Sequence, residues 1–295
     1  MNDFRGDELS GKKKYILFGS SGCLGNALRA SLEFNFGKES VIGLDSSFFQ
    51  DTNWENKLCA YLESNRIAAI IYASQSRRYR DYPEGILDVI NANYHFPTTI
   101  SEISRKAEVK FVYCSTGSVY ENSIKPISEI DSLVNEGKLN MYISSKIFAE
   151  KKILDVSLRD MTLIVRPFYI FGPGSQIPAL FPTMRNSILR GDKISLAGSN
   201  GLNFNPISSQ NAARAILFLL EYNYFGIYNL GGVETTNLRE VVEIMSSALN
   251  KKTKFIFNSL EELSVISDQT KITELGFKYL NDLEEDIKDY AVNSN

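Results

Sequence analysis

Near its start the chain reads Lys14-Tyr-Ile-Leu-Phe-Gly19-Ser-Ser-Gly22-Cys-Leu-Gly25-Asn-Ala-Leu-Arg29. An apolar run without a helical period ends at Gly19, and apolar residues recur at helical spacing after Gly25, which predicts a strand, a glycine turn and a helix. Gly19 permits a tight turn, Gly22 lets a phosphate approach the backbone, and Gly25 lets the helix pack closely on the strand. Because the first N–H groups of a helix attract an anion, the stretch predicts a phosphate site.

An acidic residue follows at the position that a dinucleotide fold requires. Asp45 comes 20 residues after Gly25, at the end of the apolar run that starts at Val41. An acid in this place binds the ribose hydroxyls of NAD and would repel the 2′-phosphate of NADP. We therefore expect NAD as the cofactor, with NADP as the alternative. The candidate cofactor-binding residues are Gly19, Ser21, Gly22, Cys23, Leu24, Gly25, Asp45, Ala73 and Lys146.

Strand and helix patterns alternate through the first half of the chain. The predicted strands after Asp45 are 66–74, 109–114 and 161–166, and the predicted helices are 55–65, 83–106 and 140–159. Such alternation favours an α/β protein with a Rossmann-type doubly wound parallel sheet, whose ligand crevice lies at the carboxyl ends of the strands. We expect residues 12–170 to form the dinucleotide-binding domain, with elements near 203–232 returning to it. Residues 171–295 should form a smaller, mainly substrate-binding lobe, helical over its last 40 residues.

Composition excludes several classes of function. A net charge of −3 gives no electrostatic footprint for nucleic acid. No apolar run approaches the ~20 residues of a membrane span, and the first residues lack the apolar core of a secretory signal. The three cysteines are scattered and the single histidine cannot build a metal cluster, so we expect no metal and a cytoplasmic location.

Three polar residues form a candidate catalytic set. Thr116 follows the strand 109–114, and Tyr142 and Lys146 are four residues apart, on one face of the helix 140–159. A tyrosine of pKa ~10 is a poor base, but a nearby ammonium and a cationic nicotinamide lower that pKa. Tyr142 can then exchange a proton with a carbonyl or carbinol oxygen that Thr116 also holds. A Tyr-x-x-x-Lys pair also occurs on ordinary helix surfaces, but the glycine turn and the Ser-Thr strand end favour catalysis.

Taken together, these motifs resemble an extended short-chain dehydrogenase/reductase of the NAD-dependent epimerase/dehydratase group, over about residues 14–290. The resemblance implies a Thr116–Tyr142–Lys146 triad, with Lys146 also holding the nicotinamide ribose and Asn93 supporting the site. It also suggests a homodimer through the helices 83–106 and 140–159. The motifs that carry it are the glycine turn, Asp45, Ser115-Thr116-Gly-Ser118-Val-Tyr120, Tyr142-x-x-x-Lys146, Arg166-Pro-Phe-Tyr-Ile-Phe-Gly-Pro173 and Gly226-Ile-Tyr-Asn-Leu-Gly-Gly232.

The chain also departs from the family pattern. Dehydratases of this group carry Asp-Glu directly after the threonine, where this chain has Gly117 and Ser118, so we disfavour a dehydratase. Two groups that typically contact a substrate diphosphate are replaced by Tyr169 and Phe204. The candidate substrate-binding residues are Ser74, Gln75, Ser118, Tyr169 and Arg185, and the arginines 77, 78 and 80 are further candidates for binding an anion or the 2′-phosphate.

The leading hypothesis is an oxidoreductase or epimerase that acts on a sugar, in particular a nucleotide-linked 4-keto sugar, in the synthesis of polysaccharide precursors. The alternative is a non-enzymatic NAD(P)-binding sensor or scaffold on the same fold.

Overall fold

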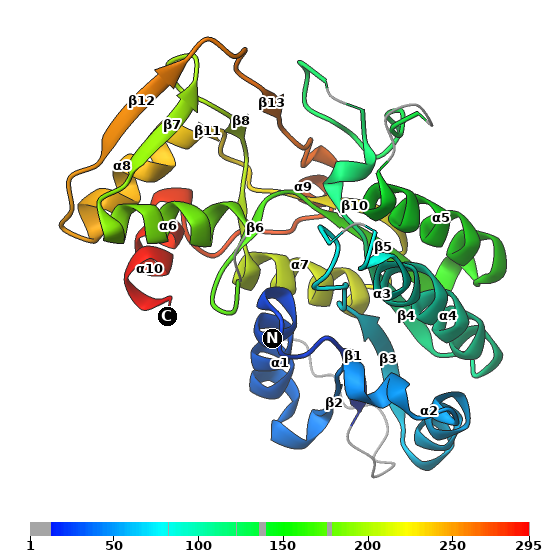
Figure 1. Cartoon of the computed structure of the whole chain (residues 1–295). Helices are drawn as coiled ribbons and strands as arrows, with labels where there is room; N and C mark the ends of the chain where they lie inside the picture. The colour runs from blue at the N-terminus through cyan, green and yellow to red at the C-terminus, as the bar shows by residue number, and fades with distance from the viewer. Residues whose placement is uncertain (1–12, 82, 122, 136–139, 176–178, 295) are drawn as a thin grey trace.

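A computed structural model describes residues 13–81, 83–121, 123–135, 140–175 and 179–294. Residue 12, where the expected dinucleotide-binding domain begins, lies outside this part of the chain. A sheet of six parallel strands forms the centre of the molecule (Figure 1), so the predicted α/β doubly wound class is confirmed. In spatial order the strands are β10 (Gly226–Leu230), β5 (Thr162–Pro167), β4 (Lys110–Cys114), β3 (Ile67–Tyr72), β1 (Lys14–Phe18) and β2 (Val41–Leu44).

Helices cover both faces of this sheet. Helices α1 (Cys23–Phe36) and α7 (Ser209–Glu221) pack on one face, against side chains such as Leu17. Helices α2 (Trp54–Ser64), α4 (Phe96–Lys106) and α5 (Met141–Val156) cover the other, against side chains such as Phe18. Both faces are buried because each strand is apolar on both sides, as parallel sheets require.

The order of the strands reverses next to β1. From β1 the chain passes to β2 on one side, and it then crosses to β3 on the other side of β1. Gly19, after β1, and Ser74, after β3, meet at this point, because a Cβ on Gly19 would lie 2.8 Å from the Ser74 backbone nitrogen. A reversal of this kind is where open α/β sheets bind their ligands.

The helical region predicted at 83–106 contains a wide turn. Helix α3 (Ile86–Ile90) leads into a π-helical turn at Asn91–His95, and α4 follows. The hydroxyls of Tyr72 and Tyr113 donate hydrogen bonds to the carbonyl oxygens of Ala92 and Asn93, at 2.6 and 2.7 Å. Two buried strands therefore hold this turn against the sheet, and such turns are frequent at functional sites.

Most of the remaining elements form a second lobe, at the upper left of Figure 1. Its apolar core includes Phe181, Phe204 and Tyr290. The helices are α6 (Leu180–Arg190), α8 (Leu238–Ala248) and α10 (Leu283–Asn293), with the parallel pair β7 (Lys193–Ala197) and β12 (Lys254–Asn258) beside them. A small sheet orders β11 (Thr236–Asn237), β8 (Asn203–Phe204) and β13 (Ser264–Val265), and β6 (Ile170–Phe171) pairs with β9 (Ile207–Ser208).

The expectation of helix through the last 40 residues is wrong. Strand β12 extends into this segment and β13 lies within it, while its helices are α9 (Thr270–Glu274) and α10. Each of these strands pairs with a strand about sixty residues earlier in the chain, so local periodicity does not report them. Among the helices of the described ranges, none is long and apolar enough to cross a membrane.

Candidate active site

The backbone of the glycine turn carries no side chain at Gly19, Gly22 and Gly25, so a ligand can approach it closely. Gly19 has a φ of +79°, which favours glycine, and a Cβ on Gly25 would lie 2.0 Å from the Gly19 carbonyl oxygen. Gly22 is the N-cap of α1, and no side chain caps the helix there. The first N–H groups of α1 are therefore left for a ligand, and the turn fits the phosphates of a dinucleotide.

Four further predicted cofactor residues lie in or beside this turn. Ser21 is exposed, Leu24 is buried in the core beneath the turn, and Ala73 follows β3, where its N–H donates to Phe18 at 3.0 Å. Cys23 is half-buried, and burial raises the pKa of its thiol. The structure thus brings these residues together at the carboxyl ends of β1 and β3.

Asp45 lies just beyond β2 and is exposed. Its Oδ1 accepts hydrogen bonds from the Ser47 backbone N–H at 2.9 Å and from the Ser47 hydroxyl at 2.6 Å. These two bonds hold the pKa of the carboxyl below its usual range, so Asp45 is anionic at neutral pH.

Thr116 and Tyr142 come from the two sides of the crevice. Thr116 follows β4 and caps a 3₁₀ turn, where its hydroxyl accepts from the Ser118 N–H at 3.2 Å. Tyr142 lies in the first turn of α5, whose N-cap is Asn140. The Tyr142 hydroxyl donates to Gln75 Oε1 at 3.4 Å and interacts with the Thr116 side chain. Residues that follow β3 and β4 thus contact the hydroxyl that α5 carries.

Lys146 lies one helical turn behind Tyr142 and is 1% exposed. Its ammonium donates to the Cys114 carbonyl oxygen at 2.9 Å and lies 4.8 Å from the centre of the Tyr113 ring. Burial lowers the pKa of Lys146 to about 8, and loss of hydration raises the pKa of Tyr142 to about 12. At neutral pH the pair is therefore a cation beside a protonated phenol.

Asn93 belongs to the π-helical turn and is fully buried. Its Nδ2 donates to the Ser145 hydroxyl at 3.1 Å, one residue before Lys146. Its Oδ1 has no hydrogen-bond partner within the part of the chain that the structure describes. The contact with Ser145 fixes α5 against the turn that the sheet tyrosines hold.

Two cavities adjoin at the candidate catalytic residues. The larger measures about 900 Å³ and the smaller about 380 Å³, and Ser118 and Ile143 line both. Gln75 and Tyr142 face the larger cavity, whereas Thr116 and Tyr169 face the smaller one. The candidate acid, its partner threonine and three candidate substrate residues, Gln75, Ser118 and Tyr169, therefore line two adjoining cavities.

The larger cavity is also lined by Arg80, one of the three candidate arginines, and by Tyr79 and Asn140, which the sequence did not single out. The Tyr79 ring lies 5.2 Å from the ring of Tyr142, and the Arg80 guanidinium lies 5.2 Å from the Tyr79 ring. In the sequence, the basic run Arg77-Arg78-Tyr79-Arg80 indicates that this segment could bind a ligand. Only the fold shows which of its residues line the cavity.

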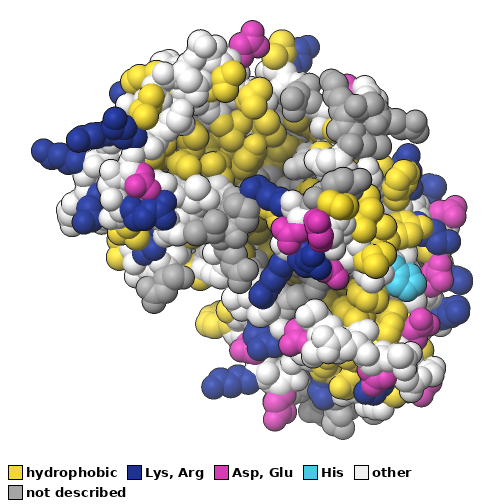
Figure 2. Space-filling model, viewed as in Figure 1, with side chains coloured by type: hydrophobic (Ala, Val, Ile, Leu, Met, Phe, Trp, Pro, Cys, Tyr) yellow, Lys and Arg dark blue, Asp and Glu magenta, His cyan; other side chains and the backbone are white. Residues whose placement is uncertain are grey.

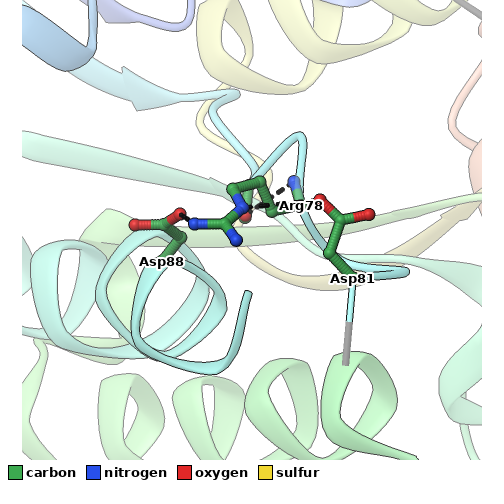
Figure 3. A network of polar contacts seen from close by, with 4 residues as sticks. Arg78, Asp81 and Asp88 are labelled. Atoms are coloured by element: carbon green, nitrogen blue, oxygen red, sulfur yellow. Dashed lines mark hydrogen bonds and ion pairs between the residues drawn. The ribbon is translucent and has the colours of Figure 1, made fainter. Parts of the chain in front are cut away.

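Arg78 is held by two carboxylates instead. Its Nε lies 3.4 Å from Asp81 and its Nη1 lies 3.0 Å from Asp88 (Figure 3). Figure 2 shows charged side chains of both signs gathered at the centre of this face, over the segment between β3 and α3 in Figure 1. The charge of Arg78 is therefore largely compensated within the protein.

Two further candidates have clear positions. Ser74 lies directly against Gly19 at the point where the strand order reverses. Arg185, on α6, donates from Nε to the Ala291 carbonyl oxygen at 2.8 Å, and it is not among the residues that line the two cavities. The structure thus places Ser74 beside the glycine turn and joins Arg185 to helix α10.

Gly117 has no room for a side chain. A Cβ there would lie 2.5 Å from the Phe168 ring, which packs among the buried residues beside the smaller cavity. Position 117 therefore lacks an acid and also lacks the space for one.

A buried ionic network supports the floor of the site. Arg166, at the end of β5, binds both carboxylate oxygens of Glu150 and donates to the Tyr120 hydroxyl. Tyr120 in turn donates to Asn229 Oδ1 at 2.8 Å. Arg166 and Glu150 are each about 3% exposed, so they satisfy each other rather than a ligand. The network connects α5, which carries Tyr142 and Lys146, to β5 and β10.

The fold and the turn together define a doubly wound nucleotide-binding α/β protein. The family model of the NAD dependent epimerase/dehydratase family matches residues 15–231, and the chain belongs to this family.

Two curated relatives are similar in sequence. An uncharacterized protein of Methanocaldococcus jannaschii is 23% identical, with 95% of each chain covered. The dTDP-4-dehydro-6-deoxyglucose reductase of Escherichia coli is 25% identical over 63% of this chain and 58% of its own.

Solved structures share the fold. The dTDP-4-dehydrorhamnose reductase of Bacillus anthracis, solved in complex with NADP, superposes with a TM-score of 0.80 at 17% identity, covering 97% of this chain and 99% of its own. The UDP-glucose 4-epimerase of Thermus thermophilus, solved with NAD, gives a TM-score of 0.76 at 17% identity, covering 94% and 97%.

Proposed function

We propose that the protein is an NAD(P)-dependent reductase or epimerase of a sugar, in particular a nucleotide-linked 4-keto sugar, with Tyr142 as the general acid and base. The observation that carries the proposal is the convergence of Tyr142, Thr116 and Gln75 at the two cavities, with the Lys146 ammonium one helical turn behind. The family membership and the reductases and epimerases among the similar proteins support it.

The chemistry follows from the state of each side chain. The glycine turn at residues 19–25 and Asp45 would hold a dinucleotide, whose nicotinamide would supply the hydride exchange with a carbonyl or carbinol carbon. In the reductive direction the protonated Tyr142 hydroxyl gives its proton to the carbonyl oxygen, and Thr116 donates a hydrogen bond to the same oxygen. The buried Lys146 ammonium stabilises the phenolate that remains, and the phenolate takes a proton back in the oxidative direction.

Several residues support the orientation of the substrate. Gln75 and Arg80 line the larger cavity and could bind hydroxyl or anionic groups, and Ser118 lies where the two cavities meet. Tyr169 and Phe204 are 5.0 Å apart at their ring centres, in place of the polar groups that bind a diphosphate in related enzymes. The absence of an acid at position 117, together with the Phe168 ring beside it, supports hydride transfer without elimination of water.

The proposal is tested by incubating the purified protein with NADH or NADPH and a panel of keto sugar nucleotides. We expect cofactor oxidation with at least one 4-keto sugar, or, for an epimerase, a changed sugar configuration by NMR without net cofactor turnover. Tight dinucleotide binding with neither reaction across the panel would instead favour the sensor or scaffold.

We also propose a cytoplasmic homodimer. Leu87 and Phe148 are 70% and 53% exposed on α3 and α5, two of the helices expected to pair between subunits. In light-scattering measurements Phe148→Glu should shift the mass from dimer to monomer, whereas Leu260→Glu, on the other lobe, should not. A monomeric wild-type protein would contradict the dimer.

A further inference from the structure

An arginine lies directly over strand β2. Arg29, in the second turn of α1, donates from Nη2 to the Ser20 hydroxyl at 3.2 Å. A Cβ on Gly43 would lie 1.9 Å from this Nη2 and 2.9 Å from the Ser20 hydroxyl oxygen. Gly43 has no left-handed φ that would require glycine. The missing side chain at position 43 therefore makes the space that the guanidinium occupies.

This place is the adenosine end of the predicted cofactor site. Ser20 belongs to the glycine turn, and Asp45 lies two residues beyond Gly43, on the same side of the extended chain. The ribose of a dinucleotide lies between these two segments, where an acid binds the 2′-hydroxyl of NAD or an arginine accommodates the 2′-phosphate of NADP. Arg29 thus lies against both segments that border the expected ribose site.

The guanidinium carries a charge that no carboxylate compensates at close range. Of the ion pairs found among the described residues, none includes Arg29, and its Nε is buried without a hydrogen-bond partner there. The arginines after β3 are placed differently, because Arg78 is paired with Asp81 and Asp88 and Arg80 faces the cavity at Tyr142. Asp45 accepts two hydrogen bonds from Ser47 at one carboxylate oxygen, Oδ1, and makes no ion pair with Arg29.

We propose that Arg29 is a specificity-determining residue that binds the 2′-phosphate of NADP, so that this protein takes NADP(H) at least as well as NAD(H) despite Asp45. The inference rests on the proposed function, since it requires a dinucleotide at the glycine turn. A guanidinium offers several N–H donors in a plane, which suits a phosphate and offsets the repulsion from one carboxylate.

The test is a titration of the purified protein with NADPH and with NADH, followed by cofactor fluorescence and checked by calorimetry. Wild type should bind NADPH at least as tightly as NADH. Arg29→Leu should lose about tenfold to a hundredfold in NADPH affinity, the value of one charged hydrogen-bonding group, while NADH affinity changes less than about twofold. Arg29→Lys should retain part of the NADPH affinity, because it keeps the charge.

Gly43→Ala is the second variant, because it keeps the arginine and moves the guanidinium out of its place. It should lose NADPH affinity selectively, as Arg29→Leu does. The matched control is Arg159→Leu, which removes an exposed arginine before β5, at the opposite end of the sheet. It should bind both dinucleotides as wild type does, and thermal melting checks that every variant is folded.

If Arg29→Leu lost as much affinity for NADH as for NADPH, Arg29 would contact a group that both dinucleotides share, and the inference would be overturned. Wild type that binds NADH but not NADPH would overturn it as well, and leave the proposed function standing. Wild type that binds neither dinucleotide would overturn the proposed function together with the inference.

Discussion

The Lys146 ammonium donates a hydrogen bond to the Cys114 carbonyl oxygen, at 2.9 Å. This bond joins helix α5 to the end of strand β4. Because Thr116 lies two residues beyond Cys114 and Tyr142 lies one turn before Lys146, the same bond sets the distance between the two hydroxyls of the site. Lys146 therefore helps to position Tyr142 relative to Thr116.

Removal of the Tyr142 hydroxyl should stop the chemistry and spare cofactor binding. Tyr142→Phe should lower turnover by about a hundredfold to ten-thousandfold, the usual contribution of a positioned acid or base. Dinucleotide affinity, measured by titration, should stay near that of wild type. Tyr222→Phe, at an exposed tyrosine after α7, is the matched control. Near-normal turnover in Tyr142→Phe would refute the assignment of the acid.

Lys146 should change how the free energy of unfolding depends on pH. Burial lowers its pKa to about 8, whereas a lysine in an unfolded chain has a pKa of ~10.4. Between these values the unfolded chain binds more protons than the folded one, so Lys146 makes the free energy of unfolding rise with pH. Urea unfolding without cofactor should therefore show that wild type gains stability relative to Lys146→Met from pH 8 to 10.

The matched control for this measurement is Lys151→Met, because Lys151 is exposed on the same helix. Its stability difference from wild type should stay flat over the same range. A difference between wild type and Lys146→Met that is flat, or that falls as pH rises, would contradict the lowered pKa.

Alanine substitutions at two glycines of the first turn should separate effects on dinucleotide affinity from effects on stability. At Gly22 a Cβ would make only an ordinary contact of 3.5 Å with the Gly19 oxygen, whereas at Gly25 it would lie 2.0 Å from that oxygen. Gly22→Ala should keep its melting temperature and lose dinucleotide affinity, because the methyl group meets the phosphate. Gly25→Ala should lower the melting temperature and also lose affinity. Normal affinity in Gly22→Ala would argue against phosphate binding at this turn.

The buried pair Arg166–Glu150 should be costly to break from one side. Arg166→Met leaves the Glu150 carboxylate buried without its cation, which typically destabilises a protein by about 3–5 kcal/mol. Arg166→Met with Glu150→Gln should recover part of that loss in urea unfolding. The exposed pair Arg239–Glu243 offers the comparison, since Arg239→Met should cost only about 0.5 kcal/mol. No recovery in the double variant would show that the arginine matters for packing alone.

Local patterns predicted the first half of the fold. Parallel strands buried on both faces give apolar runs, and the helices between them repeat at their own period, so β1 to β5 and their helices lie near the expected residues. The π-helical turn at Asn91–His95 was not expected, because its cause lies in the tyrosines of two strands that only the fold brings beneath it. In the second lobe β12 depends on β7, about sixty residues away, and local sequence carries little sign of it.

In the candidate site, too, local sequence predicted some of the residues, whereas the position of others depends on the fold. Thr116, Tyr142 and Lys146 were predictable because spacing along one helix and the end of one strand are local properties. Tyr79 and Arg80 were harder, because the loop after β3 decides which members of a basic run face the cavity. In the sequence Arg29 looks like any other residue of a helix. The place of its guanidinium depends on Gly43, on strand β2, which only the fold brings next to it.

The contact between Gly117 and Phe168 has a consequence for how this enzyme could change its reaction. A Cβ at position 117 would lie 2.5 Å from the Phe168 ring, so an aspartate introduced there alone has nowhere to go. A smaller residue at position 168 must come first, and that change opens a hole in a buried cluster before any new acid exists. A directed-evolution route that introduces an acid at position 117 therefore passes through a variant that loses stability before it gains any new group.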